Sequence, residues 1–180
     1  MNNKSVKSLA VCGMCLALAC VTSLIKVFSL PTGGSVTLLS MFFITVVGYF
    51  YGFRTGIVAA IAYGALQFVL KPEMYTPIQV LTDYILAFGS LGLSGLFKCS
   101  EKSSYNIIWG YLLGITGRFI FSTISGAVFF AEYAWEGWNP FLYSAVYNGI
   151  YIYAEGVITV IILMIPAFRK AIDRCRIISE

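Results

Sequence analysis

Four ionisable side chains lie inside long apolar stretches of the sequence: Lys26, Asp83, Arg118 and Glu155. A charge within a membrane helix costs about 2.5–3.5 kcal/mol on insertion scales, so such residues usually bind something or neutralise one another. A buried carboxylate can accept two hydrogen bonds from an amino-substituted ring. Asp83 is therefore the first candidate for a ligand-binding group.

The rise of an α-helix places these groups at two depths. At about 1.5 Å per residue, Asp83 lies roughly 9 Å below the start of its segment, and Ser122 and Asn148 lie roughly 10 Å below the ends of theirs. Three polar groups at one level predict a cavity open to that side. Arg118 and Glu155 lie deeper, at roughly 16 and 21 Å. We expect them to form a structural ion pair, which we favour over a proton relay.

Residues 130–148 combine aromatic rings with acids and an amide. Ring faces attract cations by roughly 0.5–2 kcal/mol each, so the stretch suggests a small, flat, partly cationic ligand. Polar residues at helical spacing form one stripe on the segment before this stretch and a second stripe on the segment that begins within it. The stripes are Arg118, Ser122, Ser125 and Gly126, and Ser144, Asn148, Tyr151 and Glu155. A polar seam without a ligand is the alternative for the stripes, and an interfacial belt is the alternative for Trp135 and Trp138.

Membrane helices must position these groups. The 180 residues are 59% hydrophobic and 11% charged, too few charges to cover a water-soluble domain. Six apolar segments occur, at about 6–30, 36–51, 55–70, 77–97, 106–130 and 141–168. The second and third are short for full spans, so we expect a tilt or a helix break near Gly33 and Gly34. The sequence predicts an all-α integral membrane protein with six transmembrane helices in a single domain, residues 1–180.

Basic residues indicate the orientation of these helices. Lysine and arginine gather at the ends and in alternate connections: Lys4, Lys7, Arg54, Lys98, Lys102, Arg169, Lys170, Arg174 and Arg176. The other connections carry Lys71 with Glu73, Glu132 and Glu136. By the positive-inside rule both termini are cytoplasmic, in a multi-pass protein of the bacterial plasma membrane. The loops at 31–35 and 71–76 then lie on the outer side of the membrane, above the cavity, and we expect them to act as lids.

Several kinds of function lack their sequence signatures. The chain has neither a phosphate-binding Gly-x-x-x-x-Gly-Lys-[Ser/Thr] loop nor any histidine, the commonest general base and metal ligand. Cys12 and Cys15 form a Cys-x-x-Cys pair with no second pair, so we interpret them as small packing residues. The net charge of +4 forms no nucleic-acid patch. We expect binding or transport, with no catalysis, cofactor, metal or nucleic acid.

Longer motifs carry a resemblance to a known family. They are Pro31-Thr-Gly-Gly-Ser-Val-Thr37, Asp83-Tyr84 with the later Ser90-Leu-Gly-Leu-Ser-Gly-Leu-Phe97, Tyr133-Ala-Trp-Glu-Gly-Trp138, and Tyr143-Ser-Ala-Val-Tyr-Asn-Gly149. Over nearly the whole chain the sequence resembles the thiamine-specific substrate-binding component of energy-coupling factor transporters. The resemblance implies a membrane subunit that captures thiamine from outside. It also implies association with a transmembrane coupling subunit and two ATPases.

The resemblance also implies roles for individual residues. Asp83, Tyr143 and Asn148 would hold the aminopyrimidine, and Phe130 would stack on it. Tyr84 would lie near the hydroxyethyl end, Gly126 at the cavity wall, and Ser122 beside the thiazolium. The family has glutamate, tryptophan and histidine where this chain has Asp83, Phe130 and Ser122, so a related pyrimidine or another vitamin is the alternative ligand. Small residues of the first helix match the family's docking surface for the coupling subunit: Ala10, Gly13 and Ala17.

Two other functions also fit the residues. A solitary secondary transporter driven by protons or sodium would use Asp83 or the Arg118 and Glu155 pair, and its uptake in vesicles would be abolished by an ionophore. A membrane scaffold without a ligand would leave the aromatic stretch as an interfacial belt. Alanine at Asp83 and Asn148 would then change neither ligand assays nor stability.

Overall fold

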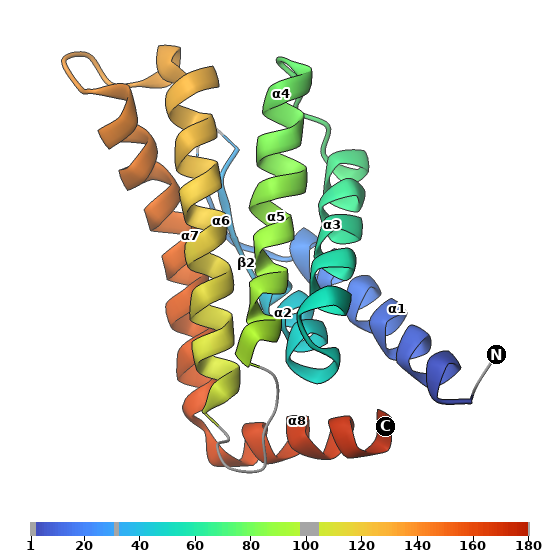
Figure 1. Cartoon of the computed structure of the whole chain (residues 1–180). Coiled ribbons are helices and arrows are strands. Elements are labelled where there is room, and N and C mark those ends of the chain that lie inside the picture. The colour runs from blue at the N-terminus through green and yellow to red at the C-terminus, as the bar shows by residue number, and fades with distance from the viewer. Residues whose placement is uncertain (1–2, 31–32, 98–104, 180) are drawn as a thin grey trace.

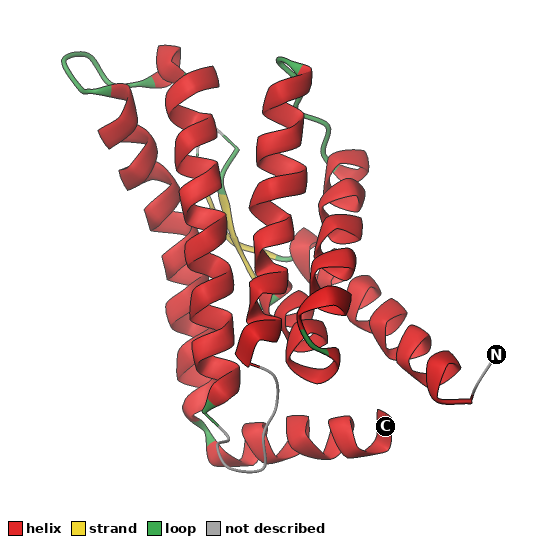
Figure 2. Cartoon of the chain, in the orientation of Figure 1, coloured by secondary structure: helices red, strands yellow, loops and turns green. Residues whose placement is uncertain are grey.

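Helices make up almost all of the computed structural model, which describes residues 3–30, 33–97 and 105–179 (Figures 1 and 2). Pro31 and Thr32 of the first motif, and Lys98, Cys99 and Lys102 of the loop at 98–104, lie outside the described residues. In chain order the elements are α1 (Asn3–Leu24), β1 (Lys26–Ser29), β2 (Ser35–Thr37), α2 (Ser40–Tyr51), α3 (Phe53–Leu70), α4 (Pro77–Val80), η1 (Leu81–Leu86), α5 (Ala87–Gly89), η2 (Ser90–Phe97), α6 (Asn106–Phe129), η3 (Ala131–Tyr133), α7 (Pro140–Met164) and α8 (Pro166–Ser179).

Within the described residues, five helices are long and apolar enough to cross a membrane. They are Ser5–Leu24, Phe53–Leu70, Pro77–Phe97, Asn106–Phe129 and Pro140–Met164. The prediction of a helical membrane protein is thus confirmed, whereas the sixth span is not. The segment predicted at 36–51 instead forms strand β2 and helix α2, whose 12 residues extend only about 18 Å against a hydrocarbon core of about 30 Å.

A two-stranded hairpin replaces the end of the first predicted helix. Helix α1 ends at Leu24, and β1 pairs antiparallel with β2, with Lys26 opposite Thr37. The backbone N–H of Leu30 donates to the Gly34 carbonyl at 2.7 Å, and Gly33 adopts a φ of 100°, which glycine accepts without strain. The described fold is therefore nearly all-helical, with one small hairpin, and the expectation of a helix continuing to residue 30 is wrong. Pairing with β2 satisfies the backbone hydrogen-bonding groups of the extended residues Lys26–Ser29. The apolar pattern of these residues did not distinguish a strand from a helix.

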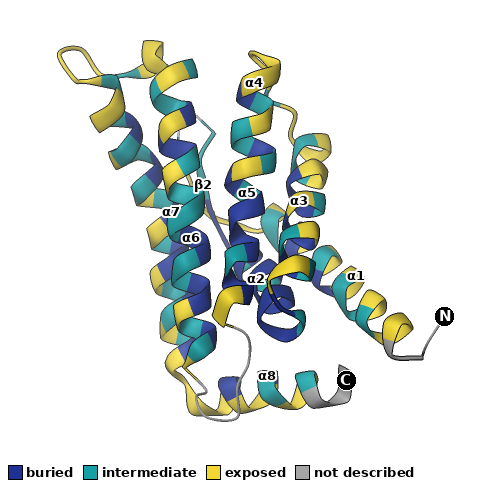
Figure 3. Ribbon diagram, viewed as in Figure 1, coloured by how far each residue is buried: buried dark blue, intermediate teal, exposed yellow. Residues whose placement is uncertain are grey.

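Helix α2 forms the centre of the packed core (Figure 3). Its residues are buried along almost the whole length, between α1, α3, η2 and α6. The approach to α3 is close because glycine faces glycine: a Cβ added to Gly56 would lie 2.8 Å from the Cα of Gly48. Small residues allow such backbone contact between membrane helices. The core therefore occupies the end of the bundle that contains the α2–α3 turn.

The helix over residues 77–97 changes its winding along its length. It begins at Thr76, whose hydroxyl accepts from the Gln79 backbone N–H at 3.1 Å, with Pro77 in the first turn. Residues Leu81–Leu86 form a π-helical turn, in which the Ala87 N–H donates to the Thr82 carbonyl five residues back. Single π turns within α-helices often mark functional sites. Asp83 and Tyr84 lie in this turn.

The last predicted segment, 141–168, is two helices. Helix α7 ends at Met164, and after Pro166 the chain continues as α8, which lies across the lower end of the bundle in Figure 1. Proline cannot donate a backbone hydrogen bond, so it favours a new helix start at this point. The apolar side of α8 packs on the core, where the Phe168 and Phe42 rings lie 5.8 Å apart. The opposite end of the bundle carries the α3–α4 and α6–α7 loops.

Candidate functional site

A cavity of about 920 Å³ lies between the hairpin, α3, the helix over 77–97, α6 and α7. Small-molecule sites usually measure about 300–1,000 Å³, so the cavity has room for a vitamin-sized ligand. All seven residues predicted to bind the ligand line it: Asp83, Tyr84, Ser122, Gly126, Phe130, Tyr143 and Asn148. The structure therefore brings together residues that are far apart in the sequence.

Asp83 presents a carboxylate on one wall of the cavity. The Gln79 side-chain amide donates to its Oδ2 at 2.7 Å, one helical turn earlier. Asp83 is partly exposed, whereas Gln79 is only 1% exposed. An ionised carboxylate has about four acceptor positions, so Asp83 keeps capacity for donors from a ligand.

Asn148 on α7 is buried against α6. Its Nδ2 donates to the Ser144 carbonyl at 2.9 Å and to the Ser122 carbonyl at 3.3 Å, and its Oδ1 accepts from the Tyr151 hydroxyl at 2.6 Å. Gly126 makes this contact possible, because a Cβ there would lie 3.3 Å from Asn148 Nδ2 and closer still to the Ser144 hydroxyl. Ser122 and Asn148 thus share a polar patch between the two helices.

Aromatic rings surround the mouth of the cavity. The Phe130 ring packs edge-on against Tyr75 at 4.9 Å, and the Tyr75 and Tyr133 hydroxyls are 2.9 Å apart. This hydrogen bond raises the pKa of Tyr75 above its ordinary value. Tyr143 stacks with Tyr147 at 5.9 Å. Rings from two loops and α7 therefore present faces and edges to a flat ligand.

The two tryptophans for which the sequence offered an interfacial belt as the alternative are outside the cavity lining. Trp135 and Trp138 are exposed and pack edge-on against each other at 5.1 Å. Trp135 also contacts the Tyr143 ring at 5.4 Å. This contact couples an indole at the surface to a ring of the cavity wall.

Glu155 lies deep in the cavity and is saturated with hydrogen bonds. It is 2% exposed and accepts from four donors, all in the segment that leads into α2. The backbone N–H groups of Thr37 and Met41 donate at 3.1 and 3.0 Å, and the hydroxyls of Thr37 and Ser40 donate at 2.6 and 3.2 Å. A carboxylate at a helix N-terminus satisfies N–H groups that have no partner in the helix.

The expected ion pair between Arg118 and Glu155 is wrong. Within the described residues, the Arg118 Nε has no hydrogen-bond partner, and the guanidinium lies 4.2 Å above the Phe88 ring. The Glu155 carboxylate is directed instead to the start of α2. The reason is that the hairpin brings β2 and the start of α2 against α7, so that their donors reach Glu155, which the helix-only prediction did not include.

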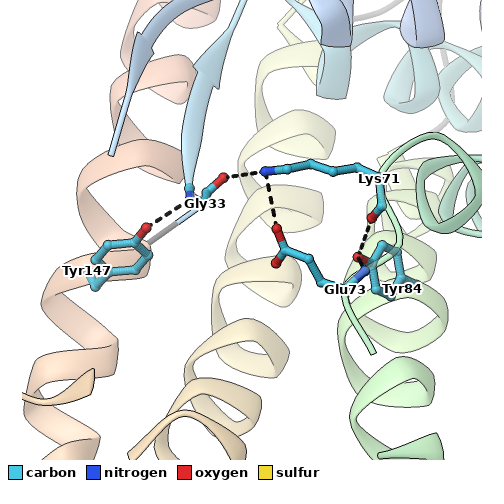
Figure 4. Close-up of polar contacts among 6 residues, drawn as sticks. Gly33, Lys71, Glu73, Tyr84 and Tyr147 are labelled. Atoms are coloured by element: carbon cyan, nitrogen blue, oxygen red, sulfur yellow. Dashed lines mark hydrogen bonds and ion pairs between the residues drawn. The ribbon is translucent and has the colours of Figure 1, made fainter. Parts of the chain in front are cut away.

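A clasp of polar contacts joins Gly33 and Gly34, from the lid loop predicted at 31–35, to the lid loop predicted at 71–76 (Figure 4). Lys71 Nζ donates to the Gly33 carbonyl at 2.9 Å and pairs with Glu73 at 3.3 Å. The Tyr84 hydroxyl donates to the Lys71 carbonyl at 2.8 Å and accepts from the Glu73 N–H at 3.1 Å. The Tyr147 hydroxyl accepts from the Gly34 N–H at 2.8 Å. Tyr84 and Tyr147 therefore hold both loops beside the cavity.

The sequence predictions missed several residues of the lining. Gln79 and Tyr147 are two of them and form hydrogen bonds to Asp83 and to the Gly34 N–H, and Tyr151, predicted only as part of a polar stripe, bonds Asn148. Gln79 was detectable one helical turn before Asp83, and Tyr147 four residues after Tyr143. The described residues contain no group of three or more His, Cys, Asp or Glu side chains placed to hold a metal ion.

The small residues of α1 lie away from the cavity. Ala10, Gly13 and Ala17 are all exposed, and a Cβ added to Gly13 would meet no atom within 4 Å. This face of α1 is therefore open to another helix.

Comparison with known proteins gives one consistent family. A family model described as thiamine transporter protein matches residues 9–173. The thiamine transporter ThiT of Bacillus subtilis is 30% identical over 146 residues, which are 75% of this chain and 76% of that protein. ThiT of Lacticaseibacillus paracasei is 27% identical over 119 residues, 58% of this chain and 59% of that protein. A solved structure of ThiT from Listeria monocytogenes superposes with a TM-score of 0.75 at 27% identity, covering 93% of this chain and 99% of the other.

Proposed function

The chain belongs to the thiamine transporter family, and from this premise we propose that it is the substrate-binding subunit of an energy-coupling factor importer that captures thiamine outside the cell. It is a multi-pass protein of the bacterial cell membrane. In the proposed role it binds the vitamin and releases it unchanged, without acting as an enzyme.

The convergence of seven residues on one cavity carries this proposal. Asp83, Tyr143 and Asn148 hold the aminopyrimidine, and Phe130 stacks on its face. Tyr84, Ser122 and Gly126 line the remaining length of the ligand. The carboxylate supplies charge-assisted hydrogen bonds, and the aromatic rings stabilise the cationic thiazolium by about 0.5–2 kcal/mol each.

The proposed topology is a single domain with six membrane segments, both termini being cytoplasmic. Helix α2 completes the six together with the five long helices, and it reaches only part of the way across the membrane. The α2–α3 turn and α8 lie at the lower end of Figure 1. Arg54 follows that turn, and Lys170 and Arg174 belong to α8, so the basic residues support this orientation. The acidic Glu132 and Glu136 lie in the loop at the opposite end. The cavity mouth then faces outward.

A coupling subunit and two ATPases complete the proposed importer. The exposed stripe of Ala10, Gly13 and Ala17 on α1 supports docking to the membrane-embedded coupling subunit. The absence of a phosphate-binding loop from the sequence supports ATP hydrolysis by separate subunits.

Titration of the purified protein with thiamine in the absence of ATP tests the proposal. We expect quenching of tryptophan fluorescence that depends on Trp135, because its ring touches Tyr143 at 5.4 Å. Trp135→Phe should lose most of the quenching. Trp109→Phe should keep it, because Trp109 lies at the start of α6, at the end of the helix opposite Phe130, and does not line the cavity. If thiamine does not bind but another vitamin or pyrimidine does, the ligand is wrong. Ionophore-sensitive uptake by this chain alone in vesicles would instead identify a solitary secondary transporter.

A further inference from the structure

Gln79 connects two parts of the site, the Asp83 carboxylate and, through Tyr75, the Phe130 ring. Building on the thiamine-binding role above, we propose that Gln79 is a positioning residue that fixes the Asp83 carboxylate as a hydrogen-bond acceptor and couples it to the stacking ring Phe130. Selection of an amino-substituted pyrimidine would follow from this coupling.

The two ends of the Gln79 amide have different partners. Its Nε2 donates to Asp83 Oδ2 at 2.7 Å, and its Oε1 accepts from the Tyr75 backbone N–H at 3.2 Å. Reversing the amide would place its oxygen against the carboxylate and its NH2 group against a backbone donor. The two partners therefore specify a single orientation of the amide.

Burial makes this arrangement demanding. Gln79 is 1% exposed although it lies at the cavity, and a buried amide without partners costs about 1–3 kcal/mol. Both hydrogen bonds are thus needed by Gln79 itself. The hydrogen bond from Nε2 also holds Oδ2 of Asp83. With about four acceptor positions, the carboxylate keeps capacity for a ligand.

Tyr75 carries the connection to the opposite wall. The residue whose backbone binds Gln79 also packs its ring against Phe130 at 4.9 Å and shares a hydrogen bond with Tyr133 at 2.9 Å. Loop 71–76 consequently fixes the carboxylate and the stacking ring relative to each other. A ligand ring held between them must present hydrogen-bond donors to Asp83, because Gln79 keeps that carboxylate in its acceptor role.

Two ligands separate positioning from general support of the fold. Oxythiamine carries a carbonyl oxygen where thiamine has the pyrimidine amino group, so at that position it accepts a hydrogen bond and cannot donate one to Asp83. In wild-type protein we expect thiamine to bind much more tightly than oxythiamine. Gln79→Leu should weaken thiamine binding about tenfold, as for one hydrogen bond to a charged group, and should reduce the thiamine to oxythiamine ratio by a similar factor.

Gln67→Leu is the matched control. Gln67 also lines the cavity but donates to the Ser23 hydroxyl at 2.9 Å, away from Asp83. This variant should keep the wild-type ratio. Gln79→Glu provides a second test with nearly the same shape, and it should also reduce the ratio because the new side chain no longer donates to Asp83 when ionised.

Asp83→Asn distinguishes failure of this inference from failure of the binding role. If Asp83→Asn abolishes thiamine binding while both Gln79 variants keep the wild-type ratio, Gln79 is not a positioning residue and the proposed function stands. If Asp83→Asn binds thiamine as tightly as wild type, the proposed site and the positioning role are both wrong.

Discussion

Two carboxylates in the same cavity have opposite surroundings. Glu155 receives four hydrogen bonds from the protein, all from residues 37–41, and is almost completely buried. Asp83 receives a hydrogen bond from Gln79 and is partly exposed to the cavity. Both are acids inside apolar segments. The sequence predicted a ligand-binding role for Asp83 and a structural role for Glu155, but it gave Glu155 the wrong partner.

The difference teaches which acid is available to a ligand. A carboxylate whose acceptor positions are filled by backbone N–H groups and hydroxyls has no capacity left. Glu155 therefore stabilises the entry of the chain into α2, where Leu39 has a φ of 63° and the first helical N–H groups need partners. Asp83 retains capacity and lies among aromatic rings. We conclude that the cavity has a structural floor and a binding wall.

The largest expected effect is the loss of stability on replacing Glu155, the structural floor of the cavity. Glu155→Ala leaves four donors without their acceptor, so we expect a loss of about 3 kcal/mol or more in stability. Thermal unfolding in detergent measures it. Glu136→Ala, in the exposed α6–α7 loop, is the control and should unfold at the wild-type temperature. Unchanged stability of Glu155→Ala would show that the floor is not structural.

Replacing Asp83, on the binding wall, should lower ligand affinity and leave stability nearly unchanged. Asp83→Asn removes the charge that holds the aminopyrimidine, and we expect thiamine affinity to fall about 100-fold, or about 2.7 kcal/mol. Without ligand, its unfolding temperature should stay close to that of wild type because Gln79 can still donate to the amide oxygen. Fluorescence titration and thermal unfolding of the same sample test both statements. A large loss of stability without thiamine would erase the contrast with Glu155.

Phe130 gives a smaller effect on the same wall. Phe130→Ala removes the stacking face, and we expect thiamine affinity to fall about tenfold. Phe130→Trp offers a larger face and should bind at least as tightly as wild type. Isothermal titration measures both variants. Equal affinities for alanine, phenylalanine and tryptophan at this position would mean that the ring does not stack on the ligand.

The exposed clasp should give the smallest effect. Lys71→Met removes the ion pair with Glu73 and the contact with the Gly33 carbonyl. Because exposed ion pairs contribute about 0–1 kcal/mol, stability should change by less than about 1 kcal/mol. Thiamine should dissociate faster, in stopped-flow measurements, since the two loops are no longer joined. An unchanged dissociation rate would show that the clasp does not control ligand exit.

Local patterns explain what could be predicted. Hydropathy and composition indicated a helical membrane protein, because apolar length and the scarcity of charge are properties of each segment by itself. Helical periodicity grouped Arg118 with Ser122, and Asn148 with Glu155, on single helix faces. Depth counting then placed Asp83, Ser122 and Asn148 at one level, and all three line the cavity.

Only the tertiary structure decided which groups donate hydrogen bonds to Glu155. The hairpin and the short buried α2 carry Thr37 to Glu155, 118 residues away in sequence, and this contact displaces the expected partnership with Arg118. Apolar periodicity describes which face of a helix is buried, but it carries no information on which distant backbone donors meet a buried carboxylate. That choice depends on the path of the chain between helices.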